Sequence, residues 1–471
     1  MDSGRRIVDV SRVTGGIVAA RAFAAISALA VAVCGGCASG TSSSALPQAV
    51  VPGISPMTRS LASNYIKHVV VIIQENRSFE NFFAGYPKAD APMWGYGLKH
   101  GRRVKIPLHQ DTFQVEPDLA HIFASAIIDW DNGKMDGFYQ PGPSGKGAAY
   151  AYIEREQVQP YWDIAKQYVL ADHMFPTEFG GSWTAHITLV AGTDNVRRKP
   201  LWALVGPSLL YDSCAAPPGA KSDVINRKRK VLDGVGPFPC FTQFNTMAQD
   251  LDQNGVSWKY YVDRTNNAAT WSPFEAIKYV RRGPDWRKDV VHPETQVLTD
   301  AKNGTLAQVS WVTPSLTDSD HPASHSDKGP SWVSSIVNAV GKGPDWSSTA
   351  IVLLWDDWGG FYDNVPPPQL DFRGLSIRVP CLIISPYAKT NYVDKTQYEY
   401  GSILKFMEEA FNLPPIGPRS AWQGYTDTRA NSLDNAFNFS QPARGFTPIQ
   451  AKYPAIYFLT MPRSNLPVDT E

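Results

Sequence analysis

The sequence predicts an α/β protein built on a mostly parallel β-sheet with helices on both faces. Short apolar runs rich in β-branched residues alternate with longer helix-like segments, and polar residues follow several of the runs directly. Short buried strands that alternate with helices form parallel sheets covered on both sides. This order of segments therefore indicates one large α/β domain with loop insertions.

Five apolar runs have the length and composition of buried strands. They are residues 68–73, 256–262, 308–312, 350–355 and 379–385. Helix-like segments lie at 241–254, 331–340 and 400–411, and another helix is expected to begin near Ser182. Strands and helices thus alternate along the chain, as the predicted fold requires.

The N-terminal residues have the layout of an export signal. Arginines precede an uncharged run at residues 22–33, which is too short to span a bilayer, and small residues follow it. We expect a signal peptide at 1–38, a flexible linker rich in Ser, Pro and Ala at 39–64, and one folded domain at 65–471. Lipidation of Cys37, with membrane attachment, and simple cleavage near Ala38 both remain open, as do the Sec and twin-arginine routes. The compartment is therefore periplasmic, extracellular or the lipid-anchored envelope surface.

The composition limits the classes of function to consider, and the positions of the cysteines predict their chemical state. The 44 basic and 44 acidic residues give a net charge of zero, which does not favour a nucleic-acid partner. An apolar fraction of 43% is too high for a disordered chain. In an oxidising compartment Cys214 and Cys240 are expected to form a disulfide, and Cys381, inside an apolar run, is expected to be a buried free thiol.

Polar side chains follow three of the predicted strands at the point where each strand ends. Glu75 and Asn76 follow the first, Asp320 and His321 follow the run at 308–312, and Asp356-Asp357 follows the run at 350–355. Ligands of open α/β sheets bind outside the carboxyl ends of the strands. We therefore expect these side chains to share one site.

Glu75, Asn76, Asp356 and Asp357 supply carboxylate and amide oxygens, which are suitable ligands for a divalent cation. Ca²⁺, Mg²⁺ and Mn²⁺ prefer such oxygens, and carboxylates also bind Zn²⁺. The alternative for either pair alone is an ordinary turn or a helix N-cap, because acidic residues are common there. Two such pairs after two buried strands favour a metal site.

Ser182 is the predicted nucleophile. Gly180 and Gly181 allow a tight turn just before it, and the expected helix would place its hydroxyl where free N–H groups attract an anion. The alternative is that Ser182 only caps the helix.

Four motifs, in this order, resemble the bacterial phosphoesterase family, which contains phospholipases C and acid phosphatases and has an alkaline-phosphatase-like fold. They are Glu75-Asn-Arg-Ser-Phe79, Asn132-Gly-Lys-Met-Asp-Gly-Phe138, Gly181-Ser-Trp183 and Asp356-Asp-Trp-Gly-Gly-Phe-Tyr-Asp363. The resemblance covers roughly residues 65–460 and makes 65–471 a phosphoesterase catalytic domain.

The resemblance also implies roles. Glu75, Asn76, Asp356 and Asp357 would be the metal ligands and Ser182 the nucleophile, while His121, His321 and His186 would be catalytic residues around the phosphate. A buried histidine bonded to a backbone carbonyl is the alternative for each of the three. Asn364 stands where the family often has histidine, which puts any contribution of that position in doubt.

The expected function is metal-dependent phosphoester hydrolysis by an exported enzyme of the phospholipase C or acid phosphatase type. The substrate would be a phosphomonoester, a phosphodiester or a phospholipid. One alternative is a surface-anchored binding protein with the same fold and no activity. Another is a sulfatase, although Ser182-Trp-Thr-Ala-His186 lacks the Cys/Ser-x-Pro-x-Arg pattern of those enzymes. The basic run at 227–230 could meet phosphate head groups, and a solvated loop is the simpler interpretation.

Overall fold

The computed structural model describes residues 60–139, 147–207, 213–264, 271–417 and 420–462. They belong to one compact unit, Thr58–Glu471. The expected signal peptide, Cys37 and most of the expected linker lie outside the described residues.

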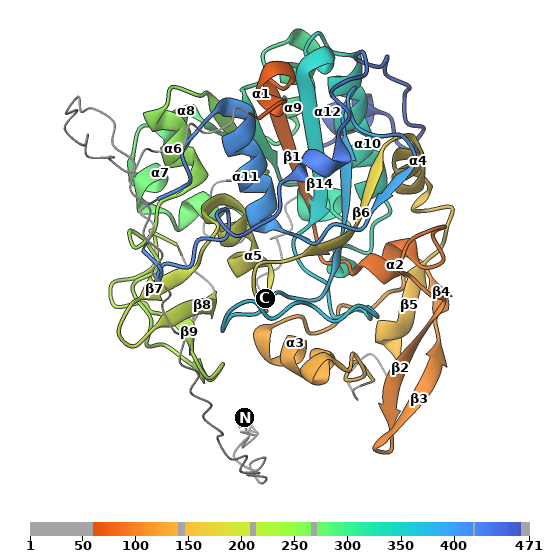
Figure 1. The fold of residues 1–471 in the computed structure, drawn as a ribbon, viewed down its shortest axis with the longest axis vertical. Coiled ribbons are helices and arrows are strands. Elements are labelled where there is room, and N and C mark those ends of the chain that lie inside the picture. Colours follow the sequence, from red (N-terminus) through yellow and green to blue (C-terminus); the bar gives the residue numbers. More distant parts are fainter. Residues whose placement is uncertain (1–59, 140–146, 208–212, 265–270, 418–419, 463–471) are drawn as a thin grey trace, which may run out of the picture. The chain divides into compact units, whose positions relative to one another are not determined.

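A nine-stranded sheet runs through the middle of the described unit (Figure 1). Its order is β12 (Val290–Val291), β11 (Trp258–Tyr261), β13 (Val309–Val312), β1 (His68–Gln74), β14 (Thr349–Trp355), β15 (Val379–Ile384), β6 (Val169–Phe175) and β16 (Tyr392–Asp394), and β17 (Tyr398–Glu399) also pairs with β6. Neighbours from β12 to β14 are parallel, and β15 is antiparallel to both of its neighbours. The prediction of a mostly parallel sheet is confirmed.

Helices cover both faces of this sheet (Figure 1). One group contains α1 (Ala62–Tyr65), α5 (Ser182–Ala191), α6 (Met247–Gln253) and α11 (Tyr400–Phe411), and the other contains α4 (Gln159–Gln167), α9 (Gln296–Asn303), α10 (Gly329–Lys342) and α12 (Ala455–Thr460). The predicted helix at 241–254 is shorter than expected. Phe241 instead makes a β-bridge with Ile277, and the helix begins only after Thr246, whose side chain accepts a hydrogen bond from Gln249 N–H.

Smaller elements are inserted between the sheet strands. A second, four-stranded sheet has the order β10 (Val231–Leu232), β9 (Ser222–Asn226), β8 (Trp202–Pro207) and β7 (Asn195–Arg197). The pairs β2 (Trp94–Lys99) with β3 (Arg102–Pro107) and β4 (His109–Asp111) with β5 (Ala151–Ile153) are separate, and the short helices are α2 (Phe79–Phe83), α3 (Phe123–Trp130), α7 (Lys278–Arg282) and α8 (Asp285–Lys288). The predicted disulfide between Cys214 and Cys240 is present. Cys381 is a buried free thiol, as predicted, and burial raises its pKa.

The two central strands, β1 and β14, are almost entirely buried, and their burial holds the carboxyl edge of the sheet in place. All seven residues of β14 are buried, and β1 is buried from Val69 onward. Fully burying a Leu, Ile or Val side chain contributes roughly 1.5–3 kcal/mol, so these two strands stabilise the unit strongly. Their register aligns Gln74 with Trp355. The residues that follow each strand therefore leave the sheet side by side.

Candidate active site

Hydrogen bonds join Glu75-Asn76 to Asp356-Asp357 where β1 and β14 end. Asp356 N–H donates to the carbonyl of Gln74 at 3.0 Å, and Asn76 N–H donates to Asp356 Oδ1 at 3.0 Å. Arg77 N–H donates to the carbonyl of Asp357 at 2.9 Å. Glu75, Asn76, Asp356 and Asp357 are all fully buried. The sheet thus brings together the four residues predicted as metal ligands.

These oxygens have the chemistry of a cation site. Burial, and then the charge of Asp356, raise the pKa of Asp357 well above its usual range. Asp356 Oδ2 is buried, and no described residue forms a hydrogen bond with it. Buried carboxylates are stable as anions only beside a compensating charge, and hard oxygens suit a divalent cation. The residues present therefore fit a bound divalent metal ion.

Asn76 joins the carboxylates to the histidines. Its φ of 56° is left-handed, a conformation that asparagine tolerates better than most residues. With its amide nitrogen toward the acids, Asn76 donates to Asp356 Oδ1 and Glu75 Oε2, each at 3.1 Å, and its oxygen faces His121 and His321. The opposite orientation puts its oxygen 3.3 Å from Ser182 Oγ. A cation among the acids would favour this second orientation, because it attracts the amide oxygen.

Ser182 is the first residue of α5, and its hydroxyl faces the acidic pairs. Ser182 Oγ donates to Asp357 Oδ2 at 3.3 Å, and the side chain is only 2% exposed. Gly181 holds the N-cap position, so the alternative that Ser182 is merely the cap is wrong. Gly180 allows the close turn, because a Cβ there would lie 2.3 Å from Thr184 Oγ1.

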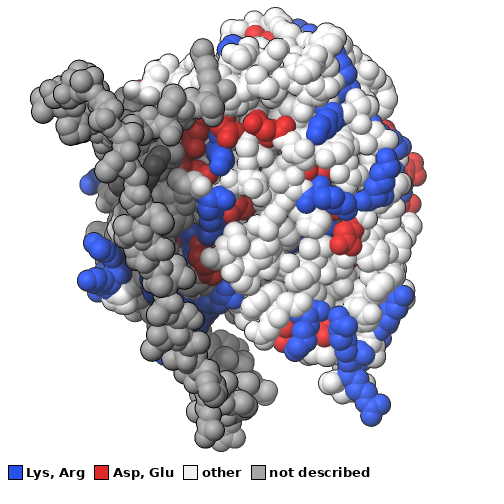
Figure 2. Space-filling view, in the orientation of Figure 1, with Lys and Arg blue, Asp and Glu red and all other residues white. Residues whose placement is uncertain are grey.

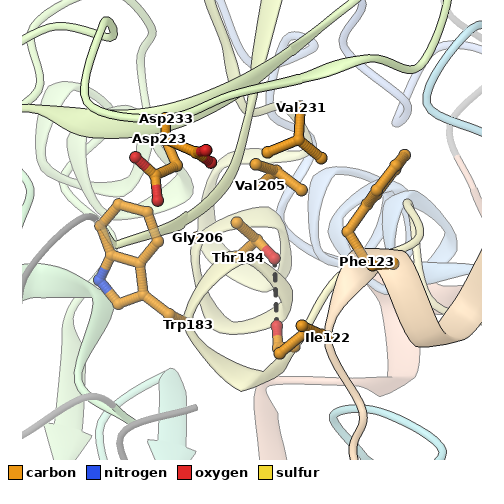
Figure 3. A pocket seen from close by; sticks show the side chains of 11 residues that line it. Ile122, Phe123, Trp183, Thr184, Val205, Gly206, Asp223, Val231 and Asp233 are labelled. Carbon is orange, nitrogen blue, oxygen red and sulfur yellow. Dashed lines mark hydrogen bonds between the residues drawn. The ribbon is translucent and has the colours of Figure 1, made fainter. Parts of the chain in front are cut away.

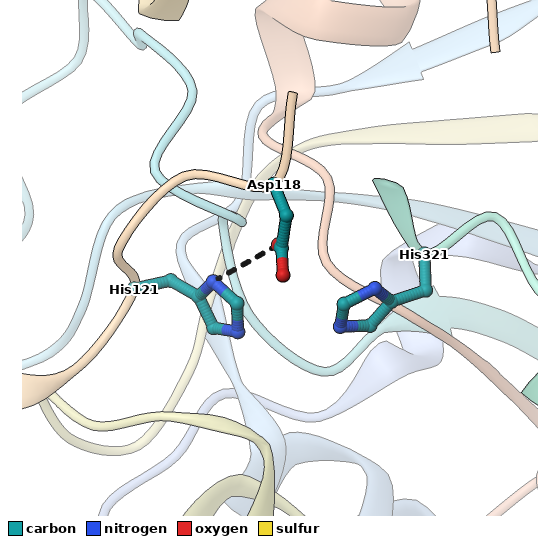
Figure 4. A group of neighbouring side chains, drawn as sticks. All are labelled: Asp118, His121 and His321. Carbon is teal, nitrogen blue, oxygen red and sulfur yellow. Dashed lines mark ion pairs between the residues drawn. The ribbon is translucent and has the colours of Figure 1, made fainter. Parts of the chain in front are cut away.

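His121 and His321 lie on the other side of Asn76, and their ring centroids are 5.8 Å apart. Figure 4 shows them with Asp118, whose Oδ1 is 4.0 Å from His121 Nδ1. His121 Nδ1 lies 2.6 Å from the Leu119 carbonyl and must donate to it. In His321 the roles are reversed, because Nδ1 accepts from Ala323 N–H at 3.1 Å and leaves the proton on Nε2. The two rings therefore present different nitrogens to a ligand.

His186 lies among the carboxylates and not beside the other two histidines. Its Nε2 is 3.0 Å from Glu75 Oε1 and 3.8 Å from Asp356 Oδ2, and Nδ1 has no hydrogen-bond partner in the part of the chain that the structure describes. Burial lowers the pKa of His186 to about 4. The side chain is thus neutral near pH 7, and its position suits holding Glu75 or ligating the metal ion.

Arg77 lies in the motif Glu75–Phe79, and the motif alone predicts no role for it. Its buried guanidinium donates to Glu116, which precedes His121, and from Nε to the carbonyl of Asp320 at 2.7 Å, next to His321. Burial lowers the pKa of Arg77 to about 9. Arg77 therefore ties together the two loops that carry the histidines, and its place directly after Asn76 was the available signal.

A pocket of about 470 Å³ opens beside Ser182 (Figure 3). Gly181 and Trp183, on either side of Ser182, line it together with Ile122, the neighbour of His121. Apolar side chains form much of the wall, and Asp223 and Asp233 lie at its far side (Figure 3). The pocket therefore adjoins the two segments that carry Ser182 and His121.

Sequence comparison now decides the family, because the Phosphoesterase family model matches residues 66–414. The chain belongs to the Phosphoesterase family. It is similar to the non-hemolytic phospholipase C of Burkholderia pseudomallei (26% identity, 80% of this chain and 59% of that protein) and to phospholipase C A of Mycobacterium tuberculosis (24%, 81% and 79%). The non-specific phospholipase C4 of Arabidopsis thaliana matches at 23% identity over 76% of this chain and 70% of that protein.

The chain spans less than two thirds of the length of the non-hemolytic phospholipases C that it matches. Among solved structures, murine ectonucleotide pyrophosphatase/phosphodiesterase 5 matches with a TM-score of 0.37 and 9% identity, over 76% of this chain and 98% of that one. A protein of the alkaline phosphatase superfamily from Vibrio parahaemolyticus matches with a TM-score of 0.35 and 9% identity, over 79% and 72%. In the part of the chain that the structure describes, no helix has the length and apolar character to cross a membrane.

Proposed function

We propose that this protein is an exported, metal-dependent phosphoester hydrolase that uses Ser182 as its nucleophile. One observation carries the proposal: a buried hydroxyl lies 3.3 Å from Asp357 Oδ2 within a buried cluster of carboxylate and amide oxygens. The family membership and the relatives named phospholipase C support the same chemistry.

Glu75, Asn76, Asp356 and Asp357 would hold the cation, which supplies charge that polarises the phosphoryl group and lowers the pKa of the serine hydroxyl. Ser182 Oγ attacks phosphorus in line, with its proton directed to Asp357. A serine–phosphorus bond forms as the bond to the leaving alcohol breaks, and water then releases phosphate or a phosphomonoester from Ser182. The N-terminal N–H groups of α5 favour the phosphoryl oxygens there.

The two histidines take separate roles in this scheme. Asp118 offers His121 a counter-charge, so a protonated His121 can give a proton to the departing alkoxide. His321, with its proton on Nε2, donates a hydrogen bond to a phosphoryl oxygen. His186 positions Glu75 or joins it as a ligand.

The substrate is a phosphomonoester or a phosphodiester such as a phospholipid, and the pocket beside Ser182 would hold the part that is not phosphate. The inactive-protein alternative is weakened because the proposed ligands and nucleophile are all present and adjacent. A sulfatase remains disfavoured because the nucleophile segment lacks the pattern that those enzymes modify.

The deciding experiment compares wild type with Ser182→Ala on p-nitrophenyl phosphate and on p-nitrophenylphosphorylcholine, after chelation and add-back of single metals. We expect turnover only with metal and a loss on the order of 10⁴-fold in the variant. Thr188→Ala is the matched control, because Thr188 lies on the same helix and its hydroxyl donates to the Ala185 carbonyl of that helix. Near-normal turnover by Ser182→Ala would refute the nucleophile, and the preferred substrate separates phosphatase from phospholipase C-like activity.

Export is tested separately in cells. Deleting residues 1–38 should retain the protein in the cytoplasm, and Cys37→Ser should change envelope attachment only if Cys37 is lipidated. If the wild-type protein stays in the cytoplasm, the proposed export is wrong, and the proposed hydrolysis is unaffected.

A further inference from the structure

The four-stranded sheet ends in two basic turns that the hydrolysis chemistry does not use. The turn from β7 to β8 carries Arg197, Arg198 and Lys199, and the turn from β9 to β10 carries Arg227, Lys228 and Lys230, all six of them exposed. Trp202 pairs with Asn226, so the two turns lie on adjacent strands, which are about 4.8 Å apart. We call these six residues the basic end; Figure 2 shows a few Lys and Arg side chains at the left edge of the molecule and others spread over the rest of that face.

The basic end is held rigidly while its charges stay free. Asn226 Oδ1 accepts from the N–H groups of Lys228 at 2.8 Å and Lys230 at 3.2 Å, which fixes the second turn. Arg229 points inward, where Nε donates to the Phe372 carbonyl at 2.8 Å. Among the described residues no ion pair involves any of the six basic side chains, and neither turn contains an acidic residue. Six uncompensated charges thus face solvent on a molecule whose formal net charge is zero.

Apolar side chains accompany these charges. Leu201 and Trp202 follow the first turn, Val231 and Leu232 follow the second, and all four are partly exposed. The Arg197 guanidinium lies 4.3 Å from the centre of the Trp202 ring. Basic residues beside apolar and aromatic side chains suit the interface of an anionic bilayer, where the cations meet head-group phosphates and the apolar groups meet the acyl boundary.

The basic end is also joined to the proposed substrate pocket. In β8, Gly206 lies four residues after Trp202, and Val205, Gly206 and Asp223 line the pocket beside Ser182. Four residues of strand span about 13 Å, so a surface held at the turns lies one short strand from the pocket. This connection makes the location useful to an enzyme that works at a lipid surface.

We propose that the basic end docks the protein on anionic phospholipid membranes. The choice of lipid rests in part on the proposed phosphoester hydrolysis, whereas the charge and exposure of the patch do not. A nucleic acid is the competing polyanion, and the apolar residues within the patch together with the neutral charge of the whole chain favour the membrane.

The test is sedimentation with vesicles of phosphatidylcholine alone or mixed with phosphatidylglycerol. The variant carries Arg227→Ser, Lys228→Ser and Lys230→Ser and keeps Arg229, which packs inward. Each basic residue near an anionic surface is worth roughly fivefold in binding, so the variant should bind mixed vesicles about a hundredfold more weakly. The control carries Arg287→Ser, Lys302→Ser and Lys342→Ser, which remove three exposed charges elsewhere. All proteins share the same N-terminus, so any attachment through Cys37 is common to them.

Salt-sensitive binding to mixed vesicles that the variant loses and the control keeps would support the proposal. Equal binding by variant and wild type, or stronger binding of wild type to a duplex DNA fragment than to mixed vesicles, would overturn it. Turnover of p-nitrophenyl phosphate is measured alongside and should be unchanged in both variants. An inactive wild type that still binds mixed vesicles would contradict the proposed hydrolysis and leave the docking surface standing.

Discussion

The two halves of the candidate site are built in different ways. The carboxylate half, Glu75, Asn76, Asp356 and Asp357, follows two adjacent buried strands whose register brings the pairs together. The histidine half, His121 and His321, stands on loops far apart in the sequence. Sheet packing fixes the first half directly, whereas side-chain hydrogen bonds fix the second.

Arg77 shows how the loops are fixed. It follows the carboxylate half by one residue and contacts both histidine loops, through Glu116 and the Asp320 carbonyl. Further bonds strengthen the second loop, because Asp320 Oδ2 accepts from Tyr161 at 2.6 Å and from Trp355 Nε1 at 3.0 Å. The proposed metal ligands are therefore held in place by the sheet, and the histidine proposed to deliver a proton is positioned by a buried polar network.

The largest effect should come from damage to the carboxylate half. Asp357→Asn removes a proposed ligand charge and the acceptor of the Ser182 hydroxyl. We expect turnover to fall on the order of a thousandfold, with weaker metal binding measured by titration calorimetry, because both the cation and the nucleophile lose their partner. The surface variant Asp434→Asn is the control. Normal activity and metal content in Asp357→Asn would exclude this residue from the metal site.

The histidine half should respond according to the leaving group. His121→Gln should cost roughly a hundredfold on an alkyl phosphoester, whose alkoxide needs a proton, and far less on p-nitrophenyl phosphate. His321→Gln should slow both substrates alike, because it removes a hydrogen bond to phosphate. If His121→Gln and His321→Gln depend on the leaving group to the same extent, the proposed division of roles between the two histidines is wrong.

The same contrast explains what the sequence could predict. The ends of β1, β13 and β14 share one edge because parallel neighbours point the same way, so the acidic pairs and His321 could be placed from strand patterns alone. His121, in a loop before α3, carried no pattern, and only the family resemblance singled it out. The four-stranded sheet was missed because its strands are short and interrupted by turns. The place of Arg77 directly after Asn76 indicates that it lies near the site, but its role could not be predicted, because its partners are set by tertiary contacts.

His186 was predicted near the phosphate, and the structure places it against Glu75 instead. That prediction came from the family resemblance, which does not tell which side of the proposed metal ligands a buried residue will contact. Its catalytic role remains a prediction, and the geometry now favours a positioning role.

Arg77→Met tests the network that holds the histidine half. Removing a buried cation leaves Glu116 uncompensated, so we expect a loss of roughly 3–5 kcal/mol in the free energy of unfolding, measured by urea denaturation. Turnover should fall about tenfold while metal affinity stays near wild type, since the sheet still holds the carboxylates. Adding Glu116→Gln should recover stability more than activity. A variant that loses metal binding as well would show that the two halves are not separately built.

The smallest effect should appear at His186, on the far side of the carboxylate half. His186→Asn should weaken metal binding about tenfold, with turnover restored at high metal concentration, because the residue orients Glu75. In metal-free protein, burial lowers the pKa of His186 to about 4, so the native state keeps the ring neutral while the unfolded chain binds a proton below about 6.5. The contribution of His186 to stability is therefore complete above that range and declines as pH falls toward 4. In urea denaturation across this window, the free energy of unfolding should fall more steeply with decreasing pH for wild type than for His186→Asn. Parallel curves would mean that the carboxylates keep His186 protonated.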